Sequence, residues 1–268
     1  MSSPDHGVDL ERALSEARAG ALEAGALLME RFGRLVPSQI GHKQVARDLV
    51  TAADVESERL LVRRLREAFP EHAIQAEEEV CDARDERPRW YLDPLDGTIN
   101  FVHRLPAFAV SVGLYLGRTP LVGVVHAPRL GETFWAAAGR GAWLDGERLA
   151  VSSAQHLGDA ILATGFPYRR GELEHDNLDN FARFFHHVRG MRRMGSAAID
   201  LAYTAAGRFD GYWELHLGAH DLAAGACLVR EAGGVVIDPD GGDAWLERGA
   251  VVAAGPRLVE AIRARVRW

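Results

Sequence analysis

The sequence predicts a layered α+β protein built from two lobes. Two long amphipathic helices and a run of short strands fill the first half of the chain, and strands alternate with helices in the second half. The 268 residues are 47% hydrophobic and 26% charged, which is typical of a globular protein. We place the boundary near residue 150, giving an N-terminal lobe of residues 1–150 and a C-terminal lobe of residues 151–268.

In the first half, residues 9–34 carry apolar side chains at helical spacing, which predicts an amphipathic helix that packs on a sheet. A second helix is expected at 52–69, where Thr51 and Asp54 resemble a capping box. Apolar residues alternate along 107–117, as in a strand with one apolar face. The expected strands, arranged as an antiparallel meander, are 72–76, 89–92, 107–117, 120–126 and 132–138.

The second half alternates between strand and helix patterns, which indicates a layered α/β lobe. Pro256 suits the first turn of a final helix, because its missing N–H is not needed there. No linker rich in Pro, Gly or Ser separates the halves, so we expect tight packing between them. The expected strands are 160–164, 191–194, 211–216, 234–238 and 250–254, and the expected helices are 173–188, 196–207, 220–232 and one that starts at Pro256.

Charge and cysteine content limit the class of partner. The formal net charge of −7 disfavours a general nucleic-acid or anionic-membrane surface, so an anionic substrate needs local positive charge. Cys81 and Cys227 form no CxxC motif, which fits a reducing cytosol and a cytoplasmic protein. The polar start MSSPDHGVDLER lacks the apolar core of a signal peptide, and no apolar run predicts a membrane span.

Two aspartates follow an apolar strand pattern in WYLDPLDGTINF, residues 90–101. Buried together, Asp93 and Asp96 would repel each other, so the segment is either an ordinary Asp-Pro-Gly turn or the place of a cation. An acidic cluster at 77–79, and Asp221 at the start of an apolar helix, favour the cation. Carboxylates combined with a backbone carbonyl suit Mg²⁺, which phosphoryl transfer needs.

The spacing of these aspartates argues against a covalent mechanism. Phosphatases of the haloacid-dehalogenase type use DxDGT, in which the first Asp is the nucleophile. The Asp-x-x-Asp spacing is one residue longer, which changes where the first carboxylate points on an extended chain. We therefore expect direct attack by water.

Three segments resemble the signatures of the inositol monophosphatase family: DPLDGTINF, GSAAIDLAYTAAGRFDGYWE and HDLAAGACLVREAGG. The similarity extends from RDLVTAAD to the AAGP near the end. It implies an α+β layered αβαβα sandwich of the inositol monophosphatase / fructose-1,6-bisphosphatase sugar-phosphatase type, with the active site between the lobes. It also implies a Mg²⁺-dependent, lithium-sensitive, homodimeric phosphomonoester hydrolase that acts on a small phosphorylated polyol, as bacterial inositol-1-monophosphatases do.

The resemblance also implies the metal ligands. Glu77, Asp93 and the Leu95 carbonyl would hold one Mg²⁺, and Asp93, Asp96 and Asp221 would hold a second. A third, weaker ion would lie near Glu77. The family pattern Gly-Glu-Glu corresponds to Ala76-Glu77-Glu78, so Glu79 is expected to be a solvated charge.

By the same resemblance, Asp54 and Thr98 would orient the attacking water, and with Glu77 they are the expected catalytic residues. Lys43 matches a flexible family lysine that reaches over the site, although a solvated surface lysine is the alternative. GSAA precedes a predicted helix, and a helix N-terminus is a ready anion site; Ser196 would also be its N-cap. The implied substrate-binding residues are Asp96, Gly97, Thr98, Gly195, Ser196, Ala197, Glu214 and Asp221.

One residue departs from the family pattern, because His220 stands where Trp usually precedes the last aspartate. A histidine there adds a titratable ring that either hydrogen-bonds Asp221 or lines a different leaving-group pocket. Other conspicuous residues have structural explanations: His186 and His187 are expected on a helix surface, Cys227 in the core. GRGAW at 139–143 is expected to be a turn, not a dinucleotide loop.

Alternative functions follow from the same residues. Glu214 favours a neutral polyol such as inositol, because a carboxylate accepts hydroxyl protons, but it also suits a cationic group. Histidinol phosphate, fructose 1,6-bisphosphate and 3′-phosphoadenosine 5′-phosphate are therefore rival substrates. A regulatory binding protein on the same fold is the rival from a different class.

Overall fold

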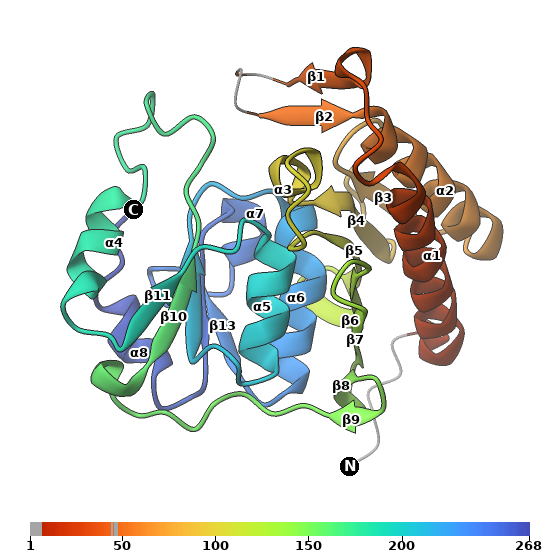
Figure 1. Ribbon diagram of the computed structural model, residues 1–268. Coiled ribbons are helices and arrows are strands. Elements are labelled where there is room, and N and C mark those ends of the chain that lie inside the picture. The colour runs from red at the N-terminus through yellow and green to blue at the C-terminus, as the bar shows by residue number, and fades with distance from the viewer. Residues whose placement is uncertain (1–6, 44, 46–47) are drawn as a thin grey trace.

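The computed structural model describes residues 7–43, 45 and 48–268. The first six residues of the predicted leaderless N-terminus, and Arg47 of RDLVTAAD, lie outside the described residues. Figure 1 shows five layers side by side, which confirms the predicted αβαβα sandwich. In order they are α1 (Leu10–Arg31) with α2 (Ala52–Ala68), a seven-stranded sheet, α5 (Ala197–Ala205) with α6 (Ala219–Glu231), a five-stranded sheet, and α4 (Leu178–Phe185) with α8 (Val259–Arg263).

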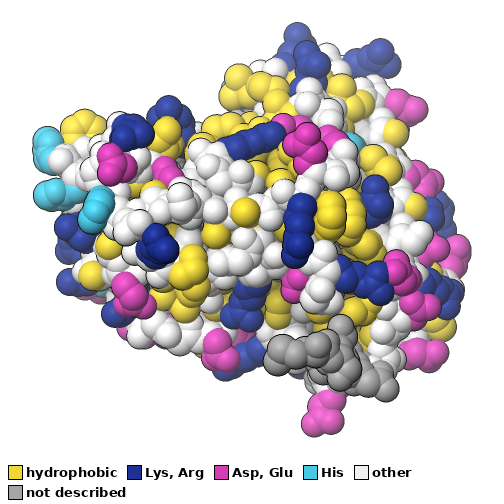
Figure 2. All heavy atoms as spheres, turned by 90° about the horizontal axis from the view of Figure 1, so that it is seen from below, with side chains coloured by type: hydrophobic (Ala, Val, Ile, Leu, Met, Phe, Trp, Pro, Cys, Tyr) yellow, Lys and Arg dark blue, Asp and Glu magenta, His cyan; other side chains and the backbone are white. Residues whose placement is uncertain are grey.

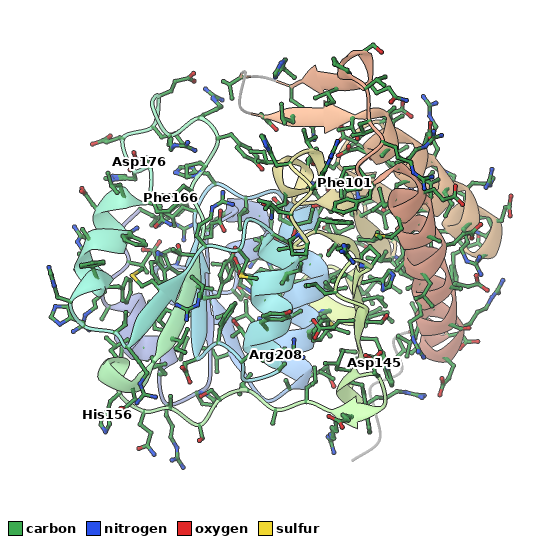
Figure 3. The ribbon with its side chains drawn as sticks, viewed as in Figure 1. Phe101, Asp145, His156, Phe166, Asp176 and Arg208 are labelled. Atoms are coloured by element: carbon green, nitrogen blue, oxygen red, sulfur yellow. The ribbon has the colours of Figure 1, made fainter. Side chains whose placement is uncertain are left out.

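The outer helices α1 and α2 form as predicted. Asp9 caps α1 by accepting a hydrogen bond from the Arg12 N–H, and the apolar stripe of the helix packs on the sheet. Thr51 and Asp54 form the predicted capping box of α2. Phe101, labelled in Figure 3, belongs to α3 (Thr98–Val102) and packs its ring against Phe32 and Phe108, with ring centroids 5.5 and 5.1 Å apart.

The seven-stranded sheet contains the predicted meander with one difference: β3 pairs with β4 in parallel, not antiparallel. Both faces of its central strands are buried, one against α1 and α2 and the other against α5 and α6. Gly139 and Arg140 form the predicted turn, but Gly141 already begins an unpredicted strand. The order is β3 (Ala73–Ala76), β4 (Arg89–Asp96), β5 (Ala109–Leu116), β6 (Thr119–Ala127), β7 (Glu132–Ala137), β8 (Gly141–Leu144) and β9 (Glu147–Arg148).

The five-stranded sheet is mixed. Its strands β10, β11 and β12 are parallel, whereas β14 runs antiparallel to β12 and β13. The order across the sheet is β11 (Gly190–Arg192), β10 (Ile161–Thr164), β12 (Gly211–Glu214), β14 (Val251–Ala254) and β13 (Val235–Ile237). The two sheets lie on either side of residue 150 along the chain, and the lobe boundary itself stays a prediction.

Two predicted helices are shorter than expected. α4 begins at Leu178 instead of 173, because Asn177 has a left-handed backbone with φ of 75° that interrupts a helix. The final helix begins at Val259, after a turn over 256–258, so the predicted start at Pro256 is wrong. Elements too short for periodicity were not predicted: β1 (Ile40–His42), β2 (Leu49–Thr51), α3, α7 (Trp245–Arg248), β8, β9 and the 3₁₀ turns Pro37–Gln39 and Leu157–Asp159.

On the face shown in Figure 2, basic and acidic side chains are interspersed. Among the helices that the structure describes, none combines the length and the apolar character needed to cross a membrane.

Candidate active site

Asp93 and Asp96 lie within the last four residues of β4, not in a turn after the strand. Residues three apart on a regular strand point to opposite faces. Here the pairing of β4 with β5 shifts between the two aspartates, and Pro94 between them has no N–H to place in a ladder. Because of this irregularity, carboxyl oxygens of Asp93, Asp96 and Asp221 all lie within 4.8 Å of one another.

Backbone groups hold these carboxylates in place. Asp93 accepts a hydrogen bond of 3.0 Å from the Leu95 N–H. Asp221, in the first turn of α6, accepts one of 2.6 Å from the Gly218 N–H. Gly97 ends the segment with φ of 94°, and a Cβ there would lie 2.9 Å from a carbonyl oxygen, so the turn into α3 requires glycine.

The electrostatics of this cluster fit a cation. Burial, then repulsion from Glu77 and Asp96, raises the pKa of Asp93 well above its usual range. Burial, then repulsion from Asp221, raises the pKa of Asp96 to about 7. Closely spaced, buried carboxylate oxygens are the donor set of a hard divalent cation, whose charge would remove this repulsion.

Lys43 lies against the acidic loop that follows β3. Its Nζ is 2.5 Å from Glu77 Oε1 and 2.6 Å from Glu78 Oε1. Burial alone would lower the pKa of Lys43, but the two glutamates raise it above its usual range. Burial raises the pKa of Glu77, but attraction to His220 and Lys43 outweighs this effect. The net pKa of Glu77 is therefore below its usual value, and the carboxylate ionises more readily. Lys43 is therefore a site residue, not a solvated surface lysine.

Glu79 lies on the surface, as predicted, in an ion pair of 2.6 Å with Arg59. The loop itself is held by Glu58, which the sequence analysis missed. This fully buried carboxylate accepts hydrogen bonds from three successive backbone N–H groups of the loop, those of Glu78, Glu79 and Val80, at 2.6, 2.7 and 3.0 Å.

A signal for Glu58 exists in the sequence. Asp54, Ser57 and Glu58 share one face of α2 with Leu61 and Leu65, and polar residues on a buried helical face need partners. Ser57 finds its partner in the Pro94 carbonyl, at 3.0 Å. This face of α2 therefore supports both β4 and the acidic loop.

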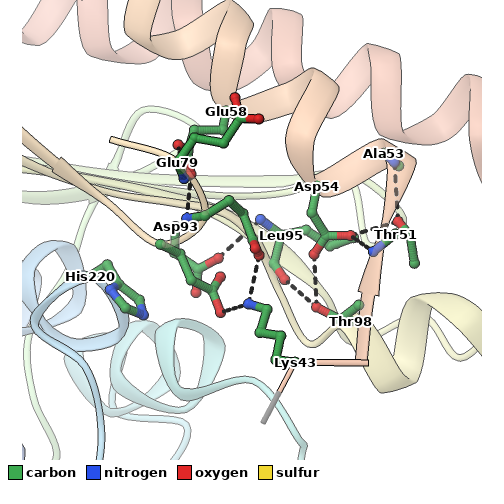
Figure 4. A network of polar contacts seen from close by, with 12 residues as sticks. Lys43, Thr51, Ala53, Asp54, Glu58, Glu79, Asp93, Leu95, Thr98 and His220 are labelled. Atoms are coloured by element: carbon green, nitrogen blue, oxygen red, sulfur yellow. Dashed lines mark hydrogen bonds and ion pairs between the residues drawn. The ribbon is translucent and has the colours of Figure 1, made fainter. Parts of the chain in front are cut away.

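Asp54 and Thr98 meet, as the predicted catalytic pair requires (Figure 4). The Thr98 hydroxyl lies 3.0 Å from Asp54 Oδ1 and 3.1 Å from the Leu95 carbonyl. Thr51 donates to Asp54 from its backbone N–H and its hydroxyl, at 2.9 and 2.6 Å. Burial raises the pKa of Asp54 to about 6, although the hydrogen bond from Thr51 opposes the rise. In Figure 4, Lys43 reaches the acidic loop from the side opposite Glu58.

The start of α5 faces the carboxylate cluster. Ser196 caps the helix, and its hydroxyl donates a hydrogen bond of 2.6 Å to Asp96 Oδ2, which also accepts 2.7 Å from the Ala198 N–H. Within the described residues, the N–H groups of Gly195, Ser196 and Ala197 have no acceptor. An anion at this helix N-terminus would therefore find three free donors.

Asn100, another residue that the sequence analysis missed, ties α3 to this segment. Its side-chain amide donates to the Ala107 carbonyl at 2.6 Å and to the Met194 carbonyl at 2.9 Å. Gly195, which follows, has φ of 86°, and a Cβ there would meet the side chains of Arg193 and Asn100.

Glu214 ends β12 and is buried. Burial raises its pKa to about 7, while a hydrogen bond of 2.6 Å from the Tyr212 hydroxyl and attraction to Arg193 oppose the rise. A side chain at Gly165 would collide with this carboxylate and displace it from its present position.

His220 lines the same cavity as Asp221, but its ring Nε2 lies 3.8 Å from the carboxylate Oδ1 of Asp221, which is too long for a hydrogen bond. The backbone carbonyl of His220 accepts a hydrogen bond of 3.3 Å from the Ser111 hydroxyl. His186 and His187 are exposed as expected, but they lie in the turn after α4, which ends at Phe185 and not at residue 188. Cys227 is buried, as expected. The cavity, of about 170 Å³, brings together Glu77, Asp96, Gly195, Ser196, Ala197, Glu214, His220 and Asp221.

The chain is similar to known proteins over nearly its whole length. The model of the inositol monophosphatase family matches residues 9–268. The chain is 43% identical over 257 residues to the Nus factor SuhB of Pseudomonas aeruginosa, covering 93% of each protein. It is 40% identical over 265 residues to the inositol-1-monophosphatase of Synechocystis, covering 97% of this chain and 92% of that one. The solved inositol monophosphatase of Anabaena (Nostoc) superimposes with a TM-score of 0.85 at 37% identity, over 96% of each chain.

Proposed function

This chain belongs to the inositol monophosphatase family, and on that premise we propose that it is a Mg²⁺-dependent phosphomonoesterase for a small polyol phosphate, with inositol 1-phosphate as the first candidate. The observation that supports this most directly is the meeting of Asp93, Asp96 and Asp221 within 4.8 Å. The free N–H groups at the start of α5 lie next to them, through the bond between Ser196 and Asp96. The cation site and the phosphate site that we propose would therefore be neighbours.

The metal ligands that we propose are those that the family resemblance implies. Glu77, Asp93 and the Leu95 carbonyl would hold one Mg²⁺, and Asp93, Asp96 and Asp221 a second, with a third near Glu77. When bound, Mg²⁺ offsets charge on the phosphoryl oxygens during transfer. Lys43 contacts Glu77 in this structure, so occupation of that position requires the lysine side chain to move away.

The protein's own groups would prepare the attacking water. The Thr98 hydroxyl lies between Asp54 and the Leu95 carbonyl, and its oxygen keeps lone pairs to accept from a water molecule. Asp54, with a pKa of about 6, is ionised at neutral pH and can take the proton as a general base. No residue needs to form a phosphoenzyme, in keeping with the Asp-x-x-Asp spacing.

The remaining residues would bind the substrate. The phosphate would lie on the N–H groups of Gly195, Ser196 and Ala197, at the positive end of the α5 dipole. Gly97 and Thr98 would approach it from the opposite side. Glu214 would accept a hydrogen bond from a hydroxyl group of the leaving alcohol.

The test is hydrolysis of inositol 1-phosphate by the purified protein, with and without Mg²⁺. We expect turnover only with Mg²⁺, inhibition by Li⁺, and loss of turnover in Asp54→Asn but not in the surface variant Asp159→Asn. Absence of turnover in Mg²⁺, or full activity in Asp54→Asn, would refute the assignment. A panel with histidinol phosphate, fructose 1,6-bisphosphate and 3′-phosphoadenosine 5′-phosphate, ranked by kcat/KM, identifies the substrate.

A second function is favoured by one relative: the Pseudomonas aeruginosa protein, 43% identical, is named a Nus factor. We infer that a regulatory role through a protein partner can accompany the phosphatase. With a net charge of −7, a protein partner fits this chain better than nucleic acid does. Affinity capture from the host cytosol tests this role, and gel filtration tests the homodimer that we expect.

A further inference from the structure

Asp200 is a buried carboxyl group that the proposed reaction does not use. It lies in the first turn of α5 and lines the cavity, with only 1% of its surface exposed. Its Oδ1 atom has no hydrogen-bond donor among the described residues. Buried polar atoms are almost always paired, so an unpaired carboxyl oxygen in the wall of a substrate cavity points to a ligand group as its partner.

The fold places Asp200 beside Glu214 and Tyr212. Tyr212 and Glu214 are two residues apart on β12, so their side chains share the face that packs against α5. Burial, followed by repulsion from Glu214, raises the pKa of Asp200 well above its usual range. Burial, followed by repulsion from both carboxyl groups, also keeps the Tyr212 hydroxyl protonated by raising its pKa. The three side chains therefore form one polar group, of which Asp200 and Glu214 line the cavity.

Glu214 has little freedom within this group. The Tyr212 hydroxyl holds its Oε2 at 2.6 Å, and the backbone at Gly165 lies so close that a Cβ there would collide with the carboxylate. The Tyr212 hydroxyl donates its one proton to Glu214 and therefore does not donate to Asp200. Asp200 keeps an oxygen without a partner while its neighbour is already fixed.

The charge around the pair favours a neutral ligand. Arg193 lines the same cavity and attracts both Asp200 and Glu214, opposing the rise of their pKa values. A cation bound between the two carboxyl groups would have to lie near this guanidinium. A hydroxyl group carries no charge and both donates and accepts, so it can satisfy Asp200 Oδ1 whether or not the carboxyl group is ionised.

We propose that Asp200 is a specificity-determining residue, which together with Glu214 binds two hydroxyl groups of a neutral polyol leaving group. The proposal rests on the phosphatase function proposed above and extends it to a substrate class. Esters whose alcohol lacks these hydroxyl groups leave Asp200 unpaired and gain nothing from it. Asp200 is accordingly needed for discrimination between alcohols, and not for hydrolysis as such.

The experiment compares two esters in the Mg²⁺-loaded enzyme: inositol 1-phosphate and p-nitrophenyl phosphate, whose alcohol carries no further hydroxyl. In Asp200→Ala, the ratio of kcat/KM for the first ester to that for the second should fall about tenfold, mainly through KM. Asp200→Asn, which keeps the size and one carbonyl oxygen, should lose less. The ratio is independent of the fraction of folded enzyme.

Asp238→Ala is the matched control, because Asp238 is equally buried but holds a turn through the N–H groups of Asp240 and Gly242, away from the cavity. It should leave the ratio unchanged even if it lowers the melting temperature. A ratio within about twofold of wild type in Asp200→Ala, or an equal loss with both esters, would show that Asp200 is structural. A third ester, phosphoethanolamine, has a cationic alcohol. If Asp200→Ala lowers kcat/KM more for inositol 1-phosphate than for phosphoethanolamine, the neutral polyol is supported. A larger loss of kcat/KM for phosphoethanolamine overturns the proposal.

Failure of the phosphatase proposal is separable from failure of this one. If the wild type hydrolyses neither ester, the proposed function is wrong, and calorimetric titration with inositol 1-phosphate then decides the role of Asp200. Binding by the wild type that is about tenfold weaker in Asp200→Ala supports the subsite. Equal binding by both proteins, or none by the wild type, overturns it.

Discussion

The Ser196 hydroxyl donates a hydrogen bond of 2.6 Å to Asp96 Oδ2, across 100 positions of the chain. Asp96 ends β4 in the seven-stranded sheet, whereas Ser196 caps α5 in the next layer. One carboxylate therefore belongs to the expected metal cluster and also fixes the helix N-terminus at which we place the phosphate. This bond sets the distance between the two halves of the proposed site.

Ser196→Ala removes this donor and also the cap that accepts from the Ile199 N–H. We expect a loss of about 1–2 kcal/mol in the free energy of unfolding, together with lower kcat/KM. Ser196→Thr keeps the hydroxyl and should retain most of both quantities. Urea unfolding and steady-state kinetics measure them, and an unchanged unfolding midpoint in Ser196→Ala would contradict this role for the bond.

Asp93→Asn removes a buried charge from the cluster. Without divalent metal the variant should be more stable than the wild type, because repulsion from Glu77 and Asp96 is relieved. Mg²⁺ at 100 times its dissociation constant should stabilise the wild type by about 2.7 kcal/mol and the variant far less. Thermal melting in EDTA tests the higher stability expected of the metal-free variant, and melting in Mg²⁺ tests its smaller stabilisation by the metal. The exposed Asp159→Asn is the control. An equal Mg²⁺ shift in both variants would exclude Asp93 as a ligand.

Glu58→Gln places an amide NH₂ against backbone N–H donors that now face a carboxylate. We expect a cost of at least about 2 kcal/mol in stability, since buried donors lose their acceptor, and weaker Mg²⁺ binding through displacement of Glu77. Glu79→Gln, which breaks only a surface pair with Arg59, should cost about 0–1 kcal/mol. Chemical unfolding measures the stability of each variant, and Mg²⁺ titration measures its affinity for the metal. Similar values for Glu58→Gln and Glu79→Gln would show that Glu58 does not position the acidic loop.

Glu214 should make stability depend on pH. Burial raises its pKa from 4.5 to about 7. The folded protein therefore holds the proton between these values while the unfolded chain has released it. Stability conferred by this group is full below about pH 4.5 and is lost as the pH rises to about 7, with a slope near 1.4 kcal/mol per pH unit.

Glu214→Gln should flatten this decline in Mg²⁺-saturated protein, as measured by urea unfolding from pH 4.5 to pH 7. The exposed Glu172→Gln should leave the slope as it is in the wild type. An unchanged slope in Glu214→Gln would mean that the carboxylate is ionised in the folded protein throughout this range.

Local patterns explain which parts of the fold were predictable. The stripe of α1 and the capping box at Thr51 depend on residues only three or four positions apart, so the sequence shows them directly. The start of α4 was misplaced, because the left-handed backbone of Asn177 has no signature in apolar spacing. Glu58 was missed because its partners are backbone N–H groups about 20 residues away, and a pattern of side chains does not show backbone contacts.

The sequence by itself determined the layered class and singled out the acidic residues of the cluster, because helical and strand periodicities, acidic residue types and family signatures are local properties of the chain. Only the tertiary structure decided how the donors meet. A regular strand would separate Asp93 from Asp96, and the shifted pairing with β5 brings them together. It also placed Lys43 on Glu77 and, among the described residues, left Asp200 Oδ1 without a donor beside Glu214. Such contacts join segments from different layers, and their distances follow from packing that no single segment encodes.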